Sequence, residues 1–493
     1  MAEAEAPESA AASAGRPARL SGHDATALAL VVACQTMLVI DASIVNVALP
    51  AMRHGLHLSV SELTWTVNAY TLAFGGLVLV GGRAGDLFGR RRMFIGSVLV
   101  FSAASLAGGL ATDGAVLFAA RAGQGIAAAV AAPSALALLM ARFPEGLLRN
   151  RALAWYAAAS GAGMTCGLLL GGMLTTWLSW RWVFFINIPV GVTIAALAPR
   201  VLDRPTRRSG RLDLAGAISG TLAVTAIVNG FIMASSDGWG SPWVPASFAA
   251  GLALAVAFVM VESGRPDPAV PLGLFRSRAR SSGYLARLAL TAAFSGMLFL
   301  LTLFMEDALG YSALGTGIAY VPSAVSIVIA SRAVPRILSR HGPRPVLIVG
   351  SAIVVVGMAW LDRLNASSHY LGAVLGPTVL FGLGAGLLYV AITQIALVGV
   401  EPGEAGVASG LITSMQQVGG SLGVAVLVTV YAARTAPAGP ARTTAAIMAP
   451  GLDAAFLAAL ALAVLLLVIT MAVPAAATRR PAPGARRPGE RVG

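Results

Sequence analysis

The stretch Leu38-Val39-Ile40-Asp41-Ala42-Ser43-Ile44-Val45-Asn46-Val47-Ala48-Leu49-Pro50 places a single carboxylate in the middle of a long apolar segment. An acidic side chain near the centre of a membrane-spanning helix costs about 2.5 to 3.5 kcal/mol on insertion scales, so it normally faces a bundle interior or a water-filled path. Burial among apolar side chains favours the protonated form of such a group, whereas a nearby cation favours the ionised form. Asp41 is therefore a candidate proton carrier.

Helix geometry gives this carboxylate a direction. At about 100° per residue, Asp41 shares one face with Cys34, Val45 and Ala48, while Asn46 lies about 140° away from it. We expect Asp41 to face an internal cavity and Asn46 to face a neighbouring helix.

The composition of the chain predicts a polytopic membrane protein. Its 493 residues are 57% hydrophobic and 11% charged, with a mean hydropathy of +0.80, whereas about a quarter of the residues of an ordinary soluble protein are charged. All 34 basic residues are arginine, so a Walker loop, which needs a lysine, is excluded and no nucleotide partner is expected. The arginines cluster in short loops between apolar segments, which favours a membrane topology signal over nucleic-acid binding.

The length of the apolar segments predicts an all-α fold with fourteen transmembrane helices, because a bilayer core of about 30 Å needs about 20 helical residues. The expected spans are 27–50, 63–82, 93–111, 115–140, 151–176, 182–201, 212–235, 244–262, 284–306, 316–334, 345–362, 371–398, 405–432 and 452–475.

Arginine placement predicts the orientation of these helices. With the N-terminus in the cytoplasm, most arginines fall on the inner side, as the positive-inside rule requires, and an even number of spans returns the C-terminus to the same side. Residues 1–24 are expected to be a disordered cytoplasmic tail, and the apolar run that follows is too long to be the core of a signal peptide. Five arginines fall on the outer side: Arg53, Arg181, Arg363, Arg434 and Arg442.

The loop from Gly82 to Arg92 combines glycines, one acid and an arginine cluster. Glycines allow two helix ends to approach closely, and Asp86 can pair with an arginine or a helix N-terminus across a domain boundary, which would hold one conformation shut. The alternative is an inner loop with an incidental acid. The residues assigned to this gating role are Gly82, Asp86, Gly89, Arg90 and Arg91.

The fourth and fifth segments carry two further patterns. Arg121 and Gln124 are spaced i, i+3 and lie on one helical face, so Arg121 either extends to the outer interface or faces the interior and pairs with Asp41. In the fifth segment a stripe of glycines predicts a helix-packing surface, which in a rocking transporter can also slide. The stripe consists of Gly163, Gly167, Gly171 and Gly172.

Four stretches together resemble the motifs of one family, the fourteen-helix drug:proton antiporter branch of the major facilitator superfamily. They are residues 41–50, 82–92, 121–125 and 180–191. The resemblance implies two six-helix bundles with two extra helices between them, and export of small lipophilic drugs or antibiotics by alternating access. One departure is Leu168, which stands where the family motif of helix 5 usually has proline, so this helix is expected to keep a continuous hydrogen-bond ladder.

The resemblance also implies a division of the chain. The expected parts are a tail (1–24), an N-terminal bundle (25–202), inserted helices 7 and 8 (203–262), a linker (263–283), a C-terminal bundle (284–475) and a basic tail (476–493).

Further polar residues are candidates for proton coupling or substrate contact. Glu306 stands where the family usually has glutamine; it either faces the cavity, as a third coupling group beside Asp41 and Arg121, or lies with Asp307 at the outer rim. Arg287 is expected to extend toward the inner interface. Amides that line the cavity or bond between helices are Asn46, Gln124, Gln394, Gln416 and Gln417.

Other function classes fit the sequence less well. A membrane enzyme that modifies lipids or acyl groups needs a catalytic constellation, but the five histidines lie in tails or loops without a metal-ligand set, so neither catalysis, metal nor cofactor is expected. A sensor would need a soluble domain to report a signal. A dedicated exporter or importer of one metabolite remains the main alternative. The expected setting is a monomer in a bacterial cytoplasmic membrane, with protons and a small lipophilic compound as partners.

Overall fold

The computed structural model describes residues 22–143, 147–202, 214–264, 272–361, 369–400, 405–435 and 444–474, and most of these residues are helical. The two predicted tails, apart from the last three residues of the first, lie outside this described part of the chain, as does the side chain of Asp86.

The described helices follow the predicted segments in order. The first group is α1 (Gly22–Leu56), α2 (Val60–Phe88), α3 (Arg90–Gly109), α4 (Gly114–Arg142), α5 (Leu147–Trp177), α6 (Trp182–Phe185) and α7 (Asn187–Val201). Two helices follow, α8 (Leu214–Ser236) and α9 (Trp243–Ser263). The last group is η2 (Leu272–Arg276), α10 (Arg278–Leu303), η3 (Phe304–Ala308), α11 (Ala313–His341), α12 (Pro343–Leu361), η4 (Tyr370–Val374), α13 (Leu375–Ala396), α14 (Ala405–Arg434) and α15 (Thr444–Met471).

The all-helical fold class is confirmed. Within the described residues, 13 helical stretches are long and apolar enough to span a membrane. Helix α5 is not among these 13, but its 31 residues exceed the span length and it packs along α1 and α11. It runs unbroken through Leu168, as expected for a position that lacks the family proline.

Local sequence explains where several helices begin. Ser59 caps α2 in a capping box with Glu62, and Asp113 caps α4 by accepting from the backbone amide of Val116. Gly89 separates α2 from α3 with a φ of 98°, a backbone conformation that glycine adopts without strain.

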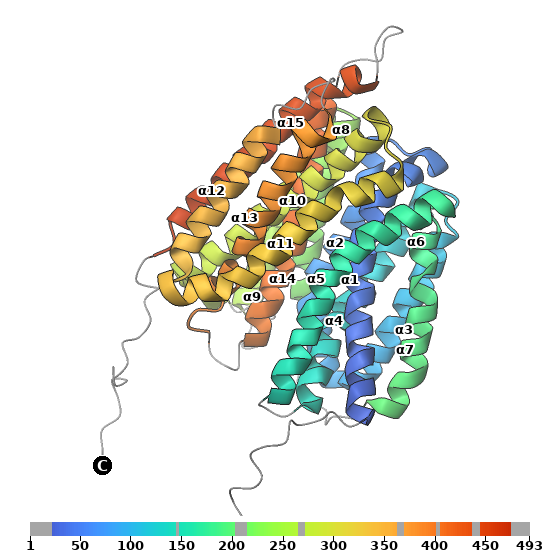
Figure 1. Cartoon of the computed structure of the whole chain (residues 1–493), viewed down its shortest axis with the longest axis vertical. Coiled ribbons are helices and arrows are strands. Elements are labelled where there is room, and N and C mark those ends of the chain that lie inside the picture. The colour runs from blue at the N-terminus through green and yellow to red at the C-terminus, as the bar shows by residue number, and fades with distance from the viewer. Residues whose placement is uncertain are drawn as a thin grey trace, which may run out of the picture.

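The helices form two groups that meet at several helix contacts (Figure 1). In the first group α2 packs on α4 and α1 packs on α5, and in the second α10 packs on α14 and α12 packs on α13. The most extensive contacts between the groups are those of α2 with α14 and of α5 with α11, and α1 also contacts α10 and α11. Helix α8 packs against α2 and α14, one from each group, and α9 covers α8.

The contact between α5 and α11 lies near the end of the bundle that holds Trp180, which we call the Trp180 end; the opposite end holds Arg142. A β-carbon built on Gly172 would lie 2.7 Å from the backbone oxygen of Ala313, and one on Gly317 would lie 2.6 Å from the backbone oxygen of Leu168. The backbones of the two groups therefore touch here without intervening side chains.

Candidate functional site: a buried ion pair between α1 and α4

The carboxylate of Asp41 is fully buried and accepts three hydrogen bonds. Its Oδ2 accepts from Nη1 of Arg121 at 2.7 Å. Its Oδ1 accepts from the amide of Gln124 and from the amide of Asn187, both at 2.8 Å. Asp41 is 0% exposed and Arg121 is 2% exposed, so the interior alternative for Arg121 is correct and the outer-interface alternative is wrong.

The guanidinium of Arg121 is held from several sides. Its Nε donates to the backbone oxygen of Thr66 at 2.9 Å, and its Nη1 also donates to Oε1 of Gln124 at 2.8 Å. Its Cζ lies 4.4 Å from the centroid of the Tyr70 ring, within the range of a cation–π contact. The amide of Gln124 completes the cluster by donating to Ser105 Oγ at 2.8 Å.

The groups of this cluster come from five packed helices. Gly125 lets α4 approach α2, because a β-carbon there would lie 2.4 Å from the backbone oxygen of Tyr70. Asn187 is the first residue of α7, which begins just after the short α6 and packs against α1. The cluster is therefore a joint of α1, α4, α7 and α3, with α2 supplying the ring and one carbonyl.

The geometry satisfies what a buried ion pair requires. Taking two charges out of water is costly, and the attraction between them offsets that cost only when the remaining donors and acceptors are also bonded. Both carboxylate oxygens and two nitrogens of Arg121 have partners within 2.9 Å. In the conformation described here both oxygens of Asp41 act as hydrogen-bond acceptors.

Three members of the cluster were missing from the sequence-based site: Asn187, Ser105 and Tyr70. Asn187 lies within the stretch Phe184 to Pro189 that supports the family resemblance, and an amide in that apolar stretch was a usable signal. Ser105 and Tyr70 had no such signal, since hydroxyl groups and aromatic rings are common in packed membrane helices.

The predicted cavity amides lie in different surroundings. Gln124 belongs to the cluster, and Asn46 donates to the backbone oxygens of Ala42 and Ser43 within its own helix. Gln394 is exposed, and Gln416 is half-buried. The β-carbon of Gln417 lies where a side chain on Gly75 of α2 would have to fit, so Gln417 packs at the contact between the two groups.

At the Trp180 end, Asp307 joins the two groups. Nη1 of Arg53 donates to Asp307 Oδ2 at 2.7 Å, and His54 Nε2 lies 3.6 Å from Asp307 Oδ1. Glu306 precedes it in the π-helical turn η3 and is half-buried, and its Oε1 has no hydrogen-bond partner within the described chain. Since the bonds of Asp41 go elsewhere, no hydrogen bond links Glu306 to the Asp41 cluster.

Arg287 does not extend to the interface, so that prediction is wrong. It is 7% exposed, its Nη2 donates to Thr393 Oγ1 at 3.1 Å, and its Cζ lies 4.7 Å from the centroid of the Tyr389 ring. The ring and hydroxyl on α13 hold the guanidinium inside the second group of helices.

The predicted gating residues are mostly helical and not in a loop: Gly82 and Asp86 belong to the end of α2, Arg90 and Arg91 begin α3, and Gly89 alone separates the two helices. Nη1 of Arg91 donates to the backbone oxygens of Pro199 and Leu202, which caps the end of α7, and Nη1 of Arg90 lies 3.5 Å from the backbone oxygen of Ala137. A β-carbon on Gly82 would meet Pro133 at 3.6 Å, an ordinary contact. All of these contacts are made within the first group of helices. The side chain of Asp86 lies outside the described part of the chain, so its predicted pairing is not described.

The predicted glycine stripe divides into two surfaces. Gly163, Gly167 and Gly171 face α1, where added β-carbons would meet Val39, Ser43 and Ile44. Gly172 faces α11 of the other group, as described above.

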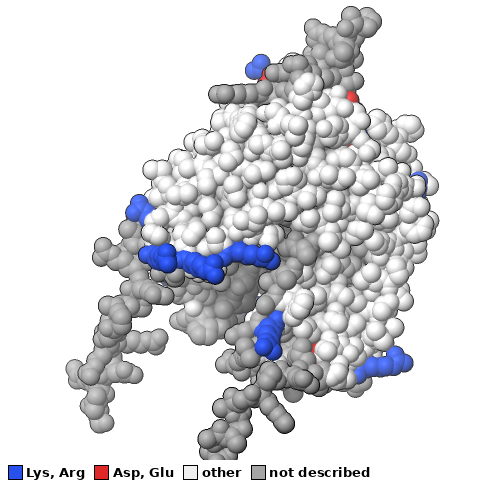
Figure 2. Space-filling view, in the orientation of Figure 1, with Lys and Arg blue, Asp and Glu red and all other residues white. Residues whose placement is uncertain are grey.

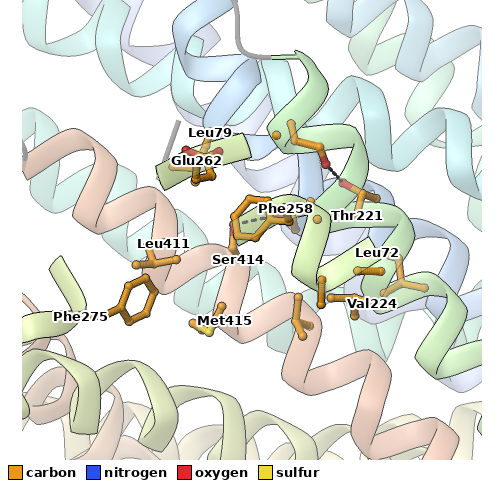
Figure 3. A pocket seen from close by; sticks show the side chains of 18 residues that line it. Leu72, Leu79, Thr221, Val224, Phe258, Glu262, Phe275, Leu411, Ser414 and Met415 are labelled. Carbon is orange, nitrogen blue, oxygen red and sulfur yellow. Dashed lines mark hydrogen bonds between the residues drawn. The ribbon is translucent and has the colours of Figure 1, made fainter. Parts of the chain in front are cut away.

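A separate cavity of about 220 Å³ lies between α2, α8, α9 and α14 (Figure 3). Its lining is almost entirely apolar, and the two hydroxyl groups there already donate to backbone oxygens, Ser414 to Gly75 and Thr221 to Ala217. Glu262 of α9 is the one carboxylate among the lining residues and is 2% exposed. Among the described residues, no group of three or more His, Cys, Asp or Glu side chains is arranged to hold a metal ion.

The sequence profile of the Major Facilitator Superfamily matches residues 31–424. The chain is 42% identical over 429 residues to the cephamycin export protein of Amycolatopsis lactamdurans, which covers 86% of this chain and 88% of that protein. It is 41% identical over 434 residues to a puromycin resistance protein of Streptomyces alboniger, with coverage of 87% and 85%. It is 32% identical over 398 residues to the multidrug resistance protein Stp of Mycobacterium tuberculosis (strain ATCC 25618 / H37Rv), with coverage of 80% and 74%.

Solved structures share the fold at lower sequence identity. A bacterial homologue of the human lysosomal transporter Spinster, in an inward-facing and unoccupied conformation, superposes with a TM-score of 0.69 at 16% identity and covers 94% of this chain and 100% of that one. The nucleoside transporter NupG superposes with a TM-score of 0.66 at 12% identity, with coverage of 91% and 99%.

Proposed function

Because this chain belongs to the Major Facilitator Superfamily, we propose that it exports small lipophilic drugs or antibiotics across the cytoplasmic membrane in exchange for protons. Relatives with 32% to 42% identity carry names of antibiotic export, antibiotic resistance and multidrug resistance. The family consists of multi-pass membrane transporters, and its bacterial members imply a location in the cell membrane.

The buried pair of Asp41 and Arg121 is the observation that supports proton coupling. Of the three side chains that donate to this carboxylate within the described residues, Arg121 is the one cation, and its charge opposes protonation of its partner. A change of conformation that separates α4 from α1 would expose Asp41 without its cation, and an isolated carboxylate in an apolar bundle favours protonation. Conformational change and protonation are thereby linked at one side chain.

The energy available to this exchange is sufficient for export. Moving one charge across 100 mV is worth about 2.3 kcal/mol, so a single exchanged proton can support a substantial outward gradient of substrate. Glu306 is a second candidate for protonation, because it is a half-buried carboxylate in a π-helical turn near the Trp180 end.

The arginine distribution supports a topology with both termini in the cytoplasm. Figure 2 shows most of the visible arginine side chains along the lower part of the molecule and a broad uncharged surface above them. That lower part holds the start of α1 and the end of α4 (Figure 1). In this topology the Trp180 end is outside and is closed in the conformation described here.

Alternating access would then move the two groups of helices, 25–202 and 284–475, as bodies around a central path. The contacts of α2 with α14 and of α5 with α11 lie where such bodies meet. We further propose that the linker 263–283 connects these bodies, that the pair 203–262 is inserted between them, and that the loop from Gly82 to Arg92 gates the transition. We expect the monomer to be the working unit.

Proton flux in proteoliposomes tests the proposal. The purified protein is reconstituted with an internal pH dye, and puromycin or another candidate compound is added to one side. We expect compound movement to drive proton movement in the opposite direction. Compound movement that proceeds at the same rate after the proton gradient is collapsed would contradict proton coupling, and absence of movement for every tested antibiotic would contradict drug export.

A dedicated exporter or importer of one metabolite is the second candidate. Expression in a sensitive strain separates the two, because a broad drug exporter protects against several unrelated toxic compounds and a dedicated one protects against one or none.

Asp307→Asn is expected to shift the conformational equilibrium toward an open Trp180 end by about fivefold, because it removes a partly buried ion pair worth about 1 kcal/mol between the two groups. The readout is the labelling rate of a cysteine at Ala313, which is 8% exposed at the closed contact, by a membrane-impermeant maleimide. The background carries Cys166→Ser, since Cys166 is exposed while Cys34 is buried.

The matched control is Asp237→Asn, which makes the same change at an exposed position in the turn between α8 and α9. Labelling should match the parent protein in this control. Equal labelling rates for Asp307→Asn and Asp237→Asn would show that the Arg53 pair does not hold the two groups together.

A further inference from the structure

The cavity between α2, α8, α9 and α14 is separate from the Asp41 cluster, and its position in the membrane points to an occupant. Helix α9 forms its outer wall and is otherwise directed away from the protein, since its buried residues are Val244, Gly251 and Glu262. Leu252, Val256 and Met260 on the same helix are exposed. One helix therefore separates the cavity from the surrounding lipid.

The lining favours an apolar molecule over water. Side chains of leucine, valine, alanine, phenylalanine and methionine surround the cavity, and the hydroxyl groups of Ser414 and Thr221 are already bonded to backbone oxygens. Water in a buried site needs two to four polar partners, and this lining leaves few. A compound that already prefers hydrocarbon would fill the space at lower cost.

The carboxylate adds a charge requirement at one end. Glu262 precedes the last residue of α9, so it lines the cavity at the end of that helix, and Figure 3 labels it among the lining side chains. The cavity extends from there toward the middle of the helices, past Ala255 and Leu72. An amphiphile dissolved in one leaflet has the same arrangement, with its polar head at the helix end and its apolar body toward the bilayer centre.

We propose that this cavity is an entry site for lipophilic monocations, in which the apolar body occupies the space between α8 and α14 and the cationic head lies against Glu262. Its occupants would arrive from the lipid past α9 and leave toward the contact between α2 and α14, where the two groups of helices meet. The role of the cavity as an entry site rests on the proposed export function. Binding of a lipophilic cation in the cavity does not depend on that function.

A matched pair of fluorescent probes tests the site by binding to the purified protein in detergent. An N-methylated styrylpyridinium dye is a cation, and its unmethylated styrylpyridine parent, measured in its neutral form, has nearly the same shape. We expect Glu262→Gln to weaken binding of the cation about tenfold, a change typical of losing one charge-assisted contact, and to leave binding of the neutral parent within about twofold.

A second variant fills the space and does not depend on the carboxylate. Ala255→Phe places a ring in the cavity from α9 and should weaken binding of both probes. Its control is Ala250→Phe on the exposed face of the same helix, and the control for Glu262→Gln is Glu62→Gln, an exposed position where glutamine preserves the capping box. Neither control should change binding of either probe.

The outcomes separate the site from the transport function. Unchanged cation binding in both Glu262→Gln and Ala255→Phe would overturn the proposal, as would a wild-type protein that binds neither probe. A second outcome is that both variants weaken cation binding as expected, while the wild-type protein moves no dye in proteoliposomes under a proton gradient. That result would support the binding site and contradict the export function for this cation.

Discussion

Replacing Asp41 with asparagine is expected to abolish proton-coupled efflux while the protein still folds and inserts. Asparagine has nearly the same shape, and its side-chain oxygen can still accept from Arg121, but it cannot bind and release a proton. Removing one partner of a buried ion pair commonly costs about 3 to 5 kcal/mol. The expected cost here is lower because Arg121 keeps its bonds to Thr66 and Gln124 and its contact with the Tyr70 ring.

The measurement compares two modes of transport in proteoliposomes. Substrate accumulation driven by an imposed proton gradient should fall to the level of empty liposomes in Asp41→Asn, whereas exchange of labelled for unlabelled substrate at equal concentrations should persist. Asp113→Asn is the matched control, because it makes the same change at an exposed helix cap where asparagine is equally effective. Gradient-driven accumulation at the wild-type rate in Asp41→Asn would remove this residue from the coupling mechanism.

Gly172→Ala is expected to reduce transport at least about tenfold by preventing closure of the Trp180 end. The added methyl group would lie 2.7 Å from the backbone oxygen of Ala313 and 2.7 Å from Cα of Leu314, and backbone atoms cannot rotate away as side chains can. Inserting a methyl into such a contact typically costs about 1 to 3 kcal/mol, so the conformation closed at this end should lose most of its population.

Gly96→Ala separates this effect from the general effect of replacing a helical glycine. A β-carbon on Gly96 would meet nothing within 4 Å, and alanine is favoured over glycine in a helix by about 1 kcal/mol, so transport and stability should be maintained or improved. In Gly172→Ala the cysteine at Ala313 should be labelled from outside at an increased rate. Transport and labelling equal to the parent protein would show that the cycle does not require the contact of α5 with α11.

The number and order of helices could be predicted because the bilayer sets the length of each apolar segment. Each predicted span overlaps a described helix, although the structure extends α1 to Leu56 and α11 to His341, beyond the hydrophobic stretch. Hydropathy cannot locate such extensions, because polar residues at a helix end can remain helical outside the membrane core.

The site was partly predictable for a different reason. Asp41 and Arg121 could be paired in advance because isolated charges in apolar helices need a partner. The contributions of Asn187 and Tyr70 depend on how α7 and α2 rotate against α1 and α4, and the sequence alone does not determine that rotation. Arg287 was misplaced for the same reason: Thr393 and Tyr389, far along the chain, supply the contacts that keep it inside.

Helix α8 is hydrogen-bonded to a helix of each group. Ser235 donates to Ser61 of α2, and the backbone oxygen of Phe231 accepts from Thr429 of α14. Nearer the other end α8 lies against α2 as well, because a β-carbon on Gly76 would collide with Thr221. The pair of α8 and α9 therefore bridges the two groups of helices along one flank of the molecule. If the two groups rotate as proposed, these contacts would keep them together on the flank of α8 and α9, so the separation between them would be larger on the opposite flank.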